Sequence, residues 1–414
     1  MNARTGNNHT ARKVPRKPSA TAKIDAVEVS VLDIVPARQR KIPSGKIPYG
    51  PAGSWIGRPV LVKICAEGVE GYGEIRPINP FVGEMAGSMY PVIRDFYAPL
   101  MIGRNVIEIE SLLNACVTAL PGHPSALAAI DIALHDVVGQ LLGVPVHALL
   151  GGACRTEIDL EWSVGLMTEG EMVKEAAQAV ERYGVGCVCV KVGPNGHEIA
   201  DARIMSAVRR EVGEQVVLGM DANTTYNTNG AINLARRLED TRIGYFEQPV
   251  ARTELQEMRR IRDVVTCAVF ADEAIFTRND AVRILKAGAA DVLGLKFYKC
   301  GGLHRMREIA AIAAGGEIGV NCAGTTAGTY LEAIAAAHLA ASIPNHMFGA
   351  EFIMGLPSVN GHDPVVENAP IDVVDGKCKV PMEPGLGVVV DQKAVKKLTL
   401  SRARIEKSGM KEHA

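Results

Sequence analysis

Residues 188–193 read VCVKVG, and comparable runs follow at residues 220–223 (MDAN), 246–249 (FEQP), 271–273 (ADE) and 295–302 (LKFYKCGG). In each, a charged residue ends a short apolar run: Lys191, Asp221, Glu247, Asp272 and Lys296. These runs recur about every 25 residues with helical patterns between them, which fits a unit of one strand and one helix. Further runs end near residues 164, 321 and 351, so eight units predict a (β/α)8 barrel. A doubly wound sheet fits less well, because no G-x-G-x-x-G turn follows the first run.

The rest of the chain divides around this barrel. Residues 23–150 show alternating strand patterns followed by helical ones, which indicates an α+β unit. Residues 1–22 carry five basic residues and no acidic one, and we expect a disordered basic tail there, although a targeting arm has the same composition. We expect residues 401–414 to be a tail as well.

Composition excludes several classes of function. The chain has 414 residues, 45 basic and 46 acidic side chains and a formal charge of −1, so nothing global favours binding to nucleic acid or to a membrane surface. No uninterrupted apolar run is long enough to predict a membrane-spanning helix. Nine cysteines without regular spacing predict reduced thiols in a cytoplasmic protein.

The charged strand ends predict the chemistry. In such a barrel the carboxyl ends of the strands meet at one mouth, so Asp221, Glu247 and Asp272 should converge there. Converging carboxylates repel one another, and Mg²⁺, which prefers oxygen ligands, would relieve that repulsion; three separate salt bridges are the alternative. Lys191 and Lys296 on either side could transfer the proton next to a substrate carboxylate, a pairing of lysine with Mg²⁺ already known for enolisation.

These motifs resemble those of the enolase superfamily, and within it the mandelate racemase/muconate lactonizing enzyme family, muconate lactonizing enzyme subgroup. The segment from Ser125 to Gly152 and the run PGLG (384–387) also resemble that family. The resemblance implies a modified TIM-type barrel over residues 151–360, an N-terminal α+β capping domain over 23–150 and a return to that domain over 361–400. It implies Mg²⁺ (or Mn²⁺) on Asp221, Glu247 and Asp272, acid/base lysines at 191 and 296, and a homo-oligomer.

The reaction is less closely specified than the superfamily. Glu351 matches a glutamate of muconate cycloisomerases, and Ile353 stands where dipeptide epimerases have a second aspartate, so the resemblance favours a cycloisomerase acting on a small-molecule carboxylate. A dehydratase of a hydroxy acid or hydroxyproline-like acid remains an alternative, as does an amino-acid racemase or epimerase. A barrel kept only as a binding protein is the alternative outside enzymes.

One residue departs from the family pattern. Cys189 stands where the family usually has the first lysine of Lys-x-Lys, and residues 189 and 191 face the same side of a strand. Without that neighbouring cation, Lys191 should be more strongly protonated and better suited as an acid than as a base. An inert packing role for Cys189 is favoured over a nucleophilic one.

Other residues are expected to surround the site. We expect Asn223 and Gln248 to hydrogen-bond the ligands, Glu273 to point away from Asp272 as a supporting or packing residue, and Lys299 to lie in a nearby loop.

The loop over residues 36–56 is a candidate lid, whose basic residues could meet an anionic substrate and whose Tyr49 and Trp55 could cover the apolar part of that substrate. A solvated loop is the alternative. The cationic candidates are Arg38, Arg40, Lys41 and Lys46.

Overall fold

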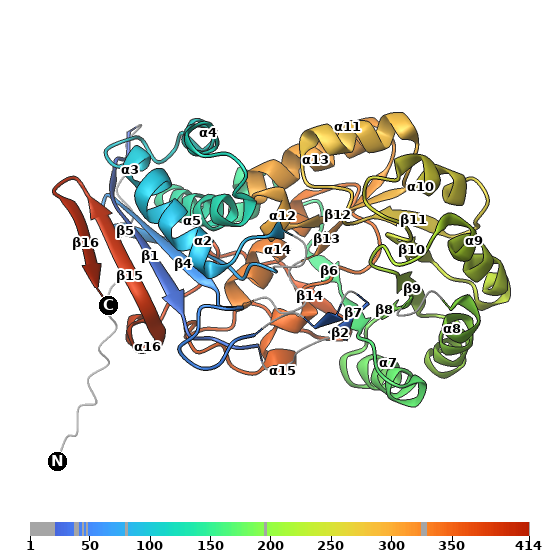
Figure 1. Ribbon diagram of the computed structural model, residues 1–414. Helices are drawn as coiled ribbons and strands as arrows, with labels where there is room; N and C mark the ends of the chain where they lie inside the picture. The colour runs from blue at the N-terminus through green and yellow to red at the C-terminus, as the bar shows by residue number, and fades with distance from the viewer. Residues whose placement is uncertain are drawn as a thin grey trace, which may run out of the picture.

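The computed structural model describes residues 21–36, 41–43, 45–46, 49–78, 82–193, 197–323 and 329–413 (Figure 1). The predictions for residues 1–20 and for Arg38 and Arg40 lie outside these ranges. Lys41 begins a two-residue strand, β2 (Lys41–Ile42), which pairs with β3 (Gly45–Lys46).

A five-stranded antiparallel sheet forms the core of the N-terminal domain. Its order is β16-β15-β1-β4-β5, with bounds β1 (Ile24–Leu32), β4 (Val60–Ala66), β5 (Val69–Ile75), β15 (Thr399–Glu406) and β16 (Gly409–His413). Residues 401–413 are therefore not a tail, and that expectation was wrong. Ala403 and Ile405 are buried in the sheet, while Arg402 pairs with Glu28 of β1. The segment is thus a strand of the sheet, because the apolar side chains on one face of β15 are buried even though the segment is rich in basic residues.

Helices cover one face of this sheet. They are α2 (Ala86–Pro91), the π-helical η1 (Val92–Tyr97), α3 (Ala98–Met101), α4 (Ile109–Ala119) and α5 (Pro124–Leu142). Helix α5 lies against the backbone of β5, because a Cβ on Gly71 would come within 2.4 Å of the Val137 nitrogen and one on Gly73 within 2.2 Å of the Ala129 oxygen. Glycine permits this close approach.

Helix α5 is also long and apolar enough to cross a membrane by length and composition, a feature that the sequence reading overlooked. In the folded chain, 83% of its most apolar window is buried inside the protein. Helix α6 (Val146–Leu149) follows it and leads into the barrel. We therefore describe α5 as a core helix of the N-terminal domain.

Seven parallel strands curl into the barrel (Figure 1). They are β7 (Glu161–Val164), β8 (Cys187–Lys191), β9 (Val217–Asp221), β10 (Tyr245–Glu247), β11 (Ala268–Ala271), β12 (Val292–Lys296) and β13 (Gly319–Ala323). The helices between and after them are α7 (Glu169–Tyr183), α8 (Glu198–Val212), α9 (Thr228–Arg237), η2 (Glu239–Thr241), α10 (Leu255–Arg262), α11 (Arg278–Ala287), α12 (Phe297–Cys300), α13 (Leu303–Gly315) and α14 (Tyr330–Ser342).

The eighth run does not form a continuous strand. His346 bridges Val320 of β13 and Ala350 bridges Leu160 before β7, so the segment occupies the eighth position through single bridges. Phe348 between them has φ 60°, a left-handed value that interrupts an extended run. The barrel is thus completed by an irregular segment.

The chain then returns toward the N-terminal domain. This part contains η3 (Ile353–Gly355), α15 (Pro357–Asn360), β14 (Lys377–Lys379) and α16 (Gln392–Leu398), and β14 pairs with β6 (Glu157–Asp159) before the barrel. The buried Asp136 of α5 accepts hydrogen bonds from the backbone N–H groups of Leu386 (2.8 Å) and Tyr72 (2.7 Å). One carboxylate therefore joins the returning segment to α5 and β5.

Candidate active site

Three acidic residues lie at the ends of neighbouring strands. Asp221 and Glu247 end β9 and β10 and are direct partners in the parallel register, while Asp272 immediately follows β11. All three are buried, with exposed fractions of 0%, 6% and 2%. Because the strands run parallel and each carboxylate ends or follows its strand, the three side chains lie at one end of the barrel, where the sequence analysis expected them.

Two lysines lie on either side of these acids. Lys191 ends β8 and forms an ion pair with Asp221. Lys296 ends β12, and its Nζ lies 2.7 Å from Asp272 Oδ2, 3.8 Å from Glu247 Oε1 and 3.7 Å from Glu351 Oε2. The irregular eighth segment therefore still delivers Glu351 to the site.

Burial and neighbouring charges shift the pKa values in this cluster. Burial, and then the charge of Asp221, raise the pKa of Glu247 well above its usual value. Burial also disfavours ionisation of Asp272, but Lys296 and Lys299 overcome it and hold its pKa below the usual range. Burial alone would lower the pKa of Lys191, yet Asp221, Glu247 and Glu351 raise it well above the ordinary lysine value.

Lys299 lies within the acidic cluster and in a short helix, whereas the sequence analysis expected it in a nearby loop. It lies in the short helix α12, is 2% exposed, and its Nζ donates to the Asp272 backbone oxygen at 2.5 Å and to Asp272 Oδ1. The strand ends at Lys296 and a helical turn follows, so a residue three positions later returns to the same side. In the sequence, the signal for this contact is the spacing Lys-x-x-Lys directly after an apolar strand.

Asn223 and Glu273 support Asp221 from the neighbouring loops. The Asn223 backbone N–H donates to Asp221 Oδ1 at 2.7 Å, and its side-chain amide donates to Asp221 Oδ2 at 3.0 Å and to Glu273 Oε1 at 3.1 Å. Glu273 has the supporting contact that the sequence analysis expected, because it accepts a hydrogen bond from the same Asn223 amide that binds Asp221. Burial and the charges of Asp272 and Asp221 raise the pKa of Glu273 to about 8.

Gln248 shapes the loop that carries Asp272. Its Oε1 accepts hydrogen bonds from the N–H groups of Asp272 at 3.0 Å and Ala274 at 3.1 Å. Gln248 has φ 33°, an uncommon backbone value for a residue other than glycine. The side chain therefore organises the backbone next to the acidic cluster.

Cys189 and Glu161 lie inside the barrel. The Cys189 side chain is 1% exposed, and its Sγ lies 4.0 Å from Glu247 Oε2. Glu161, which the sequence reading missed, accepts hydrogen bonds from Tyr245 Oη at 2.6 Å and from Cys187 Sγ at 3.4 Å. Burial, and then Glu351, raise the pKa of Glu161 to about 8. Glu161 stands at the start of an apolar strand, and nothing in the sequence around it indicates that it faces the barrel interior.

The two aromatic residues of the candidate lid pack on the N-terminal domain. Trp55 makes an edge contact with Tyr90 of α2, with ring centroids 5.4 Å apart. Tyr49 is half-buried beside Arg76, and burial raises its pKa. In the described structure their contacts are with this domain, and a role in covering substrate stays a prediction.

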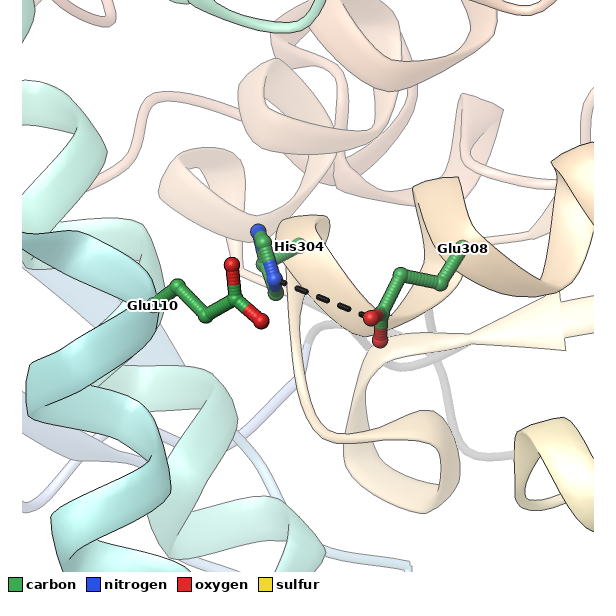
Figure 2. Close-up of side chains that lie close together, drawn as sticks. All are labelled: Glu110, His304 and Glu308. Carbon is green, nitrogen blue, oxygen red and sulfur yellow. Dashed lines mark ion pairs between the residues drawn. The ribbon is translucent and has the colours of Figure 1, made fainter.

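Figure 2 shows a second group of potential metal ligands, Glu110 of α4 with His304 and Glu308 of α13. Glu308 already pairs with Arg278 at 2.6 Å and with Arg305 at 3.1 Å, and its Oε1 lies 3.9 Å from His304 Nε2. Two arginines thus neutralise this carboxylate. The strand-end carboxylates fit a cation better, because they converge in the barrel with their charges incompletely balanced.

Comparison with known proteins gives consistent matches along the chain. Residues 56–151 match the model of the mandelate racemase / muconate lactonizing enzyme N-terminal domain, and residues 171–394 match the enolase C-terminal domain-like model. Muconate cycloisomerase 1 of Rhodococcus opacus is 33% identical over 384 residues, covering 91% of this chain and 98% of that protein. The L-Ala-D/L-Glu epimerase of Bacillus subtilis is 30% identical, covering 80% and 88%.

A solved structure agrees with these matches. The N-succinyl Arg/Lys racemase of Bacillus cereus superposes with a TM-score of 0.84 at 25% identity, covering 93% of this chain and all of that one. The two family models together span most of the barrel and its cap. The chain therefore belongs to the mandelate racemase / muconate lactonizing enzyme family of the enolase superfamily.

Proposed function

We propose that this protein is a Mg²⁺-dependent isomerase that acts on a small carboxylate through an enediolate, and more specifically a cycloisomerase of the muconate lactonizing type. The arrangement of Lys191 and Lys296 on either side of three buried acidic strand ends carries the proposal. The 33% identity to a muconate cycloisomerase over nearly its whole length supports the specific reaction.

The donor set fits a divalent cation. Five acidic side chains, Asp221, Glu247, Asp272, Glu273 and Glu351, lie around three ammonium groups. The raised pKa values of Glu247 and Glu273 reflect this crowding of carboxyl groups, which a divalent cation would relieve. Carboxylate oxygens suit Mg²⁺ or Mn²⁺. We infer that Asp221, Glu247 and Asp272 would hold the ion. When bound, it supplies Lewis-acid stabilisation of the charge that develops on the substrate carboxylate.

The lysines transfer the proton. In the lactonizing direction the ammonium of Lys191 or Lys296 donates a proton to the carbon next to the carboxylate, and in the reverse direction the neutral amine removes it. Acidic neighbours raise the pKa of both Lys191 and Lys296, which favours the ammonium form of each. We assign the acid to Lys191 because residue 189 beside it is a cysteine and not a cation. Burial of both lysines excludes water from the proton-transfer path.

An epimerase or racemase is the second candidate. Two lysines on opposite sides of the acids could remove a proton from one face of a carbon and return it on the other. The similarity to the L-Ala-D/L-Glu epimerase supports it. Against a dipeptide substrate, residue 353 is a buried isoleucine and offers no carboxylate to a substrate ammonium group.

Three assays separate the candidates. A cycloisomerase bleaches the near-ultraviolet absorbance of cis,cis-muconate, and an epimerase exchanges the α-proton of L-Ala-L-Glu in D₂O. A dehydratase, the remaining alternative, gives a keto acid that reacts with a carbonyl reagent. We expect muconate turnover that EDTA abolishes and Mg²⁺ restores. Turnover indifferent to EDTA would reject the metal-dependent mechanism.

Variants test the two lysines. Lys296→Ala and Lys191→Ala should each reduce turnover by orders of magnitude while circular dichroism stays unchanged, since no other base replaces the lost amine. Lys174→Ala on the exposed face of α7 is the matched control and should keep wild-type turnover. Near-normal activity of either active-site variant would contradict its role.

A further inference from the structure

A second cavity lies between the N-terminal domain and the barrel. Its volume is about 470 Å³, which falls in the usual range of small-molecule pockets. The N-terminal domain contributes Val117 of α4 and Leu127 of α5, and the barrel contributes loop residues after β10 and β11 together with α12 and α13. Helix α5 contacts both α12 and α13, so the cavity belongs to the junction between the two domains (Figure 1).

The cavity is lined by cations. Arg252, Arg278, Lys299 and Arg305 reach it, and none of its lining residues in the described structure is acidic. Arg278 and Arg305 share the single carboxylate of Glu308, and Lys299 is bound to Asp272. Arg252 instead lies over the ring of Phe276, with its Cζ 5.6 Å from the ring centroid, and among the described residues it forms no ion pair. Arg252, an exposed residue at the edge of the cavity, is therefore the cation of this set that has no ion-pair partner among the described residues.

Most of the remaining wall is apolar, with His123 and Thr277 as its polar members. Tyr97, Val117, Leu127, Phe276 and Ile309 contribute rings and aliphatic side chains. An apolar cavity with a single unpaired guanidinium matches a ligand with a compact apolar body and one negative charge. A small inorganic anion would leave the apolar wall without a partner, and a neutral molecule would make no use of the Arg252 charge.

We propose that this cavity is a second ligand site, separate from the strand-end cluster, and that it takes a small amphipathic monocarboxylate. The carboxylate pairs with Arg252, and the apolar body lies against Phe276 and Leu127. Lys299 connects this site to the barrel, because the same side chain lines the cavity and donates to Asp272. The proposal does not depend on which reaction the strand-end lysines perform.

Benzoate is the probe, titrated calorimetrically into the full-length protein with EDTA present. EDTA removes any divalent cation that could hold a carboxylate at the strand ends, and the three lysines there are already paired with Asp221 and Asp272. We expect one benzoate per chain and binding at least about tenfold weaker for acetate and for benzyl alcohol, which each lack one of the two features. Absence of saturable benzoate binding would overturn the proposal.

Two variants locate the binding. Arg252→Ala should weaken benzoate binding about tenfold by removing the charged partner. Val117→Trp should abolish it by filling the cavity, with thermal unfolding confirming that the variant is folded. Arg210→Ala on the exposed face of α8 is the control and should bind as wild type. Wild-type affinity in Arg252→Ala would place benzoate elsewhere and refute the site.

Discussion

At the scale of single residues, Lys299 links the acidic cluster to the domain junction. Its ammonium holds both the backbone oxygen and the carboxylate of Asp272. We predict that Lys299→Met lowers kcat/KM and raises the Mg²⁺ concentration needed for half-maximal activity, each by about 10- to 100-fold, since a supporting partner of a metal ligand is lost. Steady-state kinetics across a Mg²⁺ series measures both effects.

The control for this experiment is Lys174→Met, which removes an exposed lysine of α7. It should leave both the kinetic constants and the Mg²⁺ requirement unchanged. A Lys299→Met enzyme with the wild-type Mg²⁺ requirement would show that Asp272 is held in place without this ammonium. Lys299→Arg distinguishes charge from geometry, because it keeps the cation but changes its shape.

The burial of the His338 ring determines part of how the free energy of unfolding depends on pH. It is fully buried, its Nδ1 lies 3.3 Å from the His147 backbone N–H and its Nε2 lies 3.5 Å from the Leu386 oxygen, a pattern that suits the neutral ring. Burial, and then the charge of His147, lower its pKa to about 3. As pH falls from about 6.5 to about 3, the unfolded chain binds a proton that the folded chain cannot, so the free energy of unfolding decreases.

The expected slope is up to about 1.4 kcal/mol per pH unit from this residue, and no contribution is expected above pH about 7. Denaturant unfolding at several pH values below 7 measures it, and His338→Gln should flatten the acid limb. His362→Gln, at an exposed histidine, should leave the slope unchanged. An equally steep acid limb in His338→Gln would assign the acid sensitivity to other groups.

One rule explains why the positions of five charged residues could be predicted from the sequence. Lys191, Asp221, Glu247, Asp272 and Lys296 each follow an apolar run, and a parallel barrel brings such positions to one end. Lys299 and Glu161 follow no such rule. Lys299 reaches Asp272 only because a helical turn starts after β12, and Glu161 occupies an interior strand position. Both depend on backbone geometry that strand spacing alone does not determine.

At the scale of elements, the contact between α5 and β5 depends on glycine. We predict that Gly73→Ala lowers the free energy of unfolding by at least about 2 kcal/mol, because its Cβ would meet the α5 backbone at 2.2 Å. Gly186→Ala is the matched control, since a Cβ there meets nothing within 4 Å. Thermal unfolding compares the two, and equal midpoints would show that α5 can shift away from the sheet.

Local signals predicted some elements well and others poorly. Thr168 and Glu171 have the Thr-x-x-Glu spacing of a capping box, and the Thr168 N–H donates to Glu171 Oε2 at 2.9 Å at the start of α7. Helix α7 ends at Gly184, which is in the left-handed conformation that glycine favours. The hairpin β15–β16 was missed because its strand pairs with β1, far away in sequence. The eighth strand was overpredicted because the left-handed conformation of Phe348 leaves no clear mark in sequence.

At the scale of the whole molecule, the barrel and the N-terminal domain share an interface around α5. The Ser125 hydroxyl donates to the Tyr298 backbone oxygen at 2.9 Å, and Asp131 accepts the His304 N–H at 3.1 Å. A Cβ on Gly302 would come within 2.3 Å of the Asp131 carboxylate. These contacts join α5 to the segment that directly follows Lys296.

We therefore predict that a fragment spanning residues 153–398 does not fold alone, because it exposes the surface of α12 and α13 that α5 covers. Circular dichroism and size-exclusion chromatography of the fragment test this, with the full chain as the control. A soluble fragment with a cooperative melting transition would show that the barrel is independent. The expected homo-oligomeric state and cytoplasmic location stay predictions from the sequence.

The pairing of β1 with β15 has a consequence for biosynthesis. Ala26 lies opposite Glu406, so the first and nearly the last strand of the chain are neighbours in one sheet. During translation β1 gains this partner only after the barrel segments between the two strands have been synthesised. The nascent chain therefore carries an unfinished, chaperone-accessible sheet edge until β15 emerges.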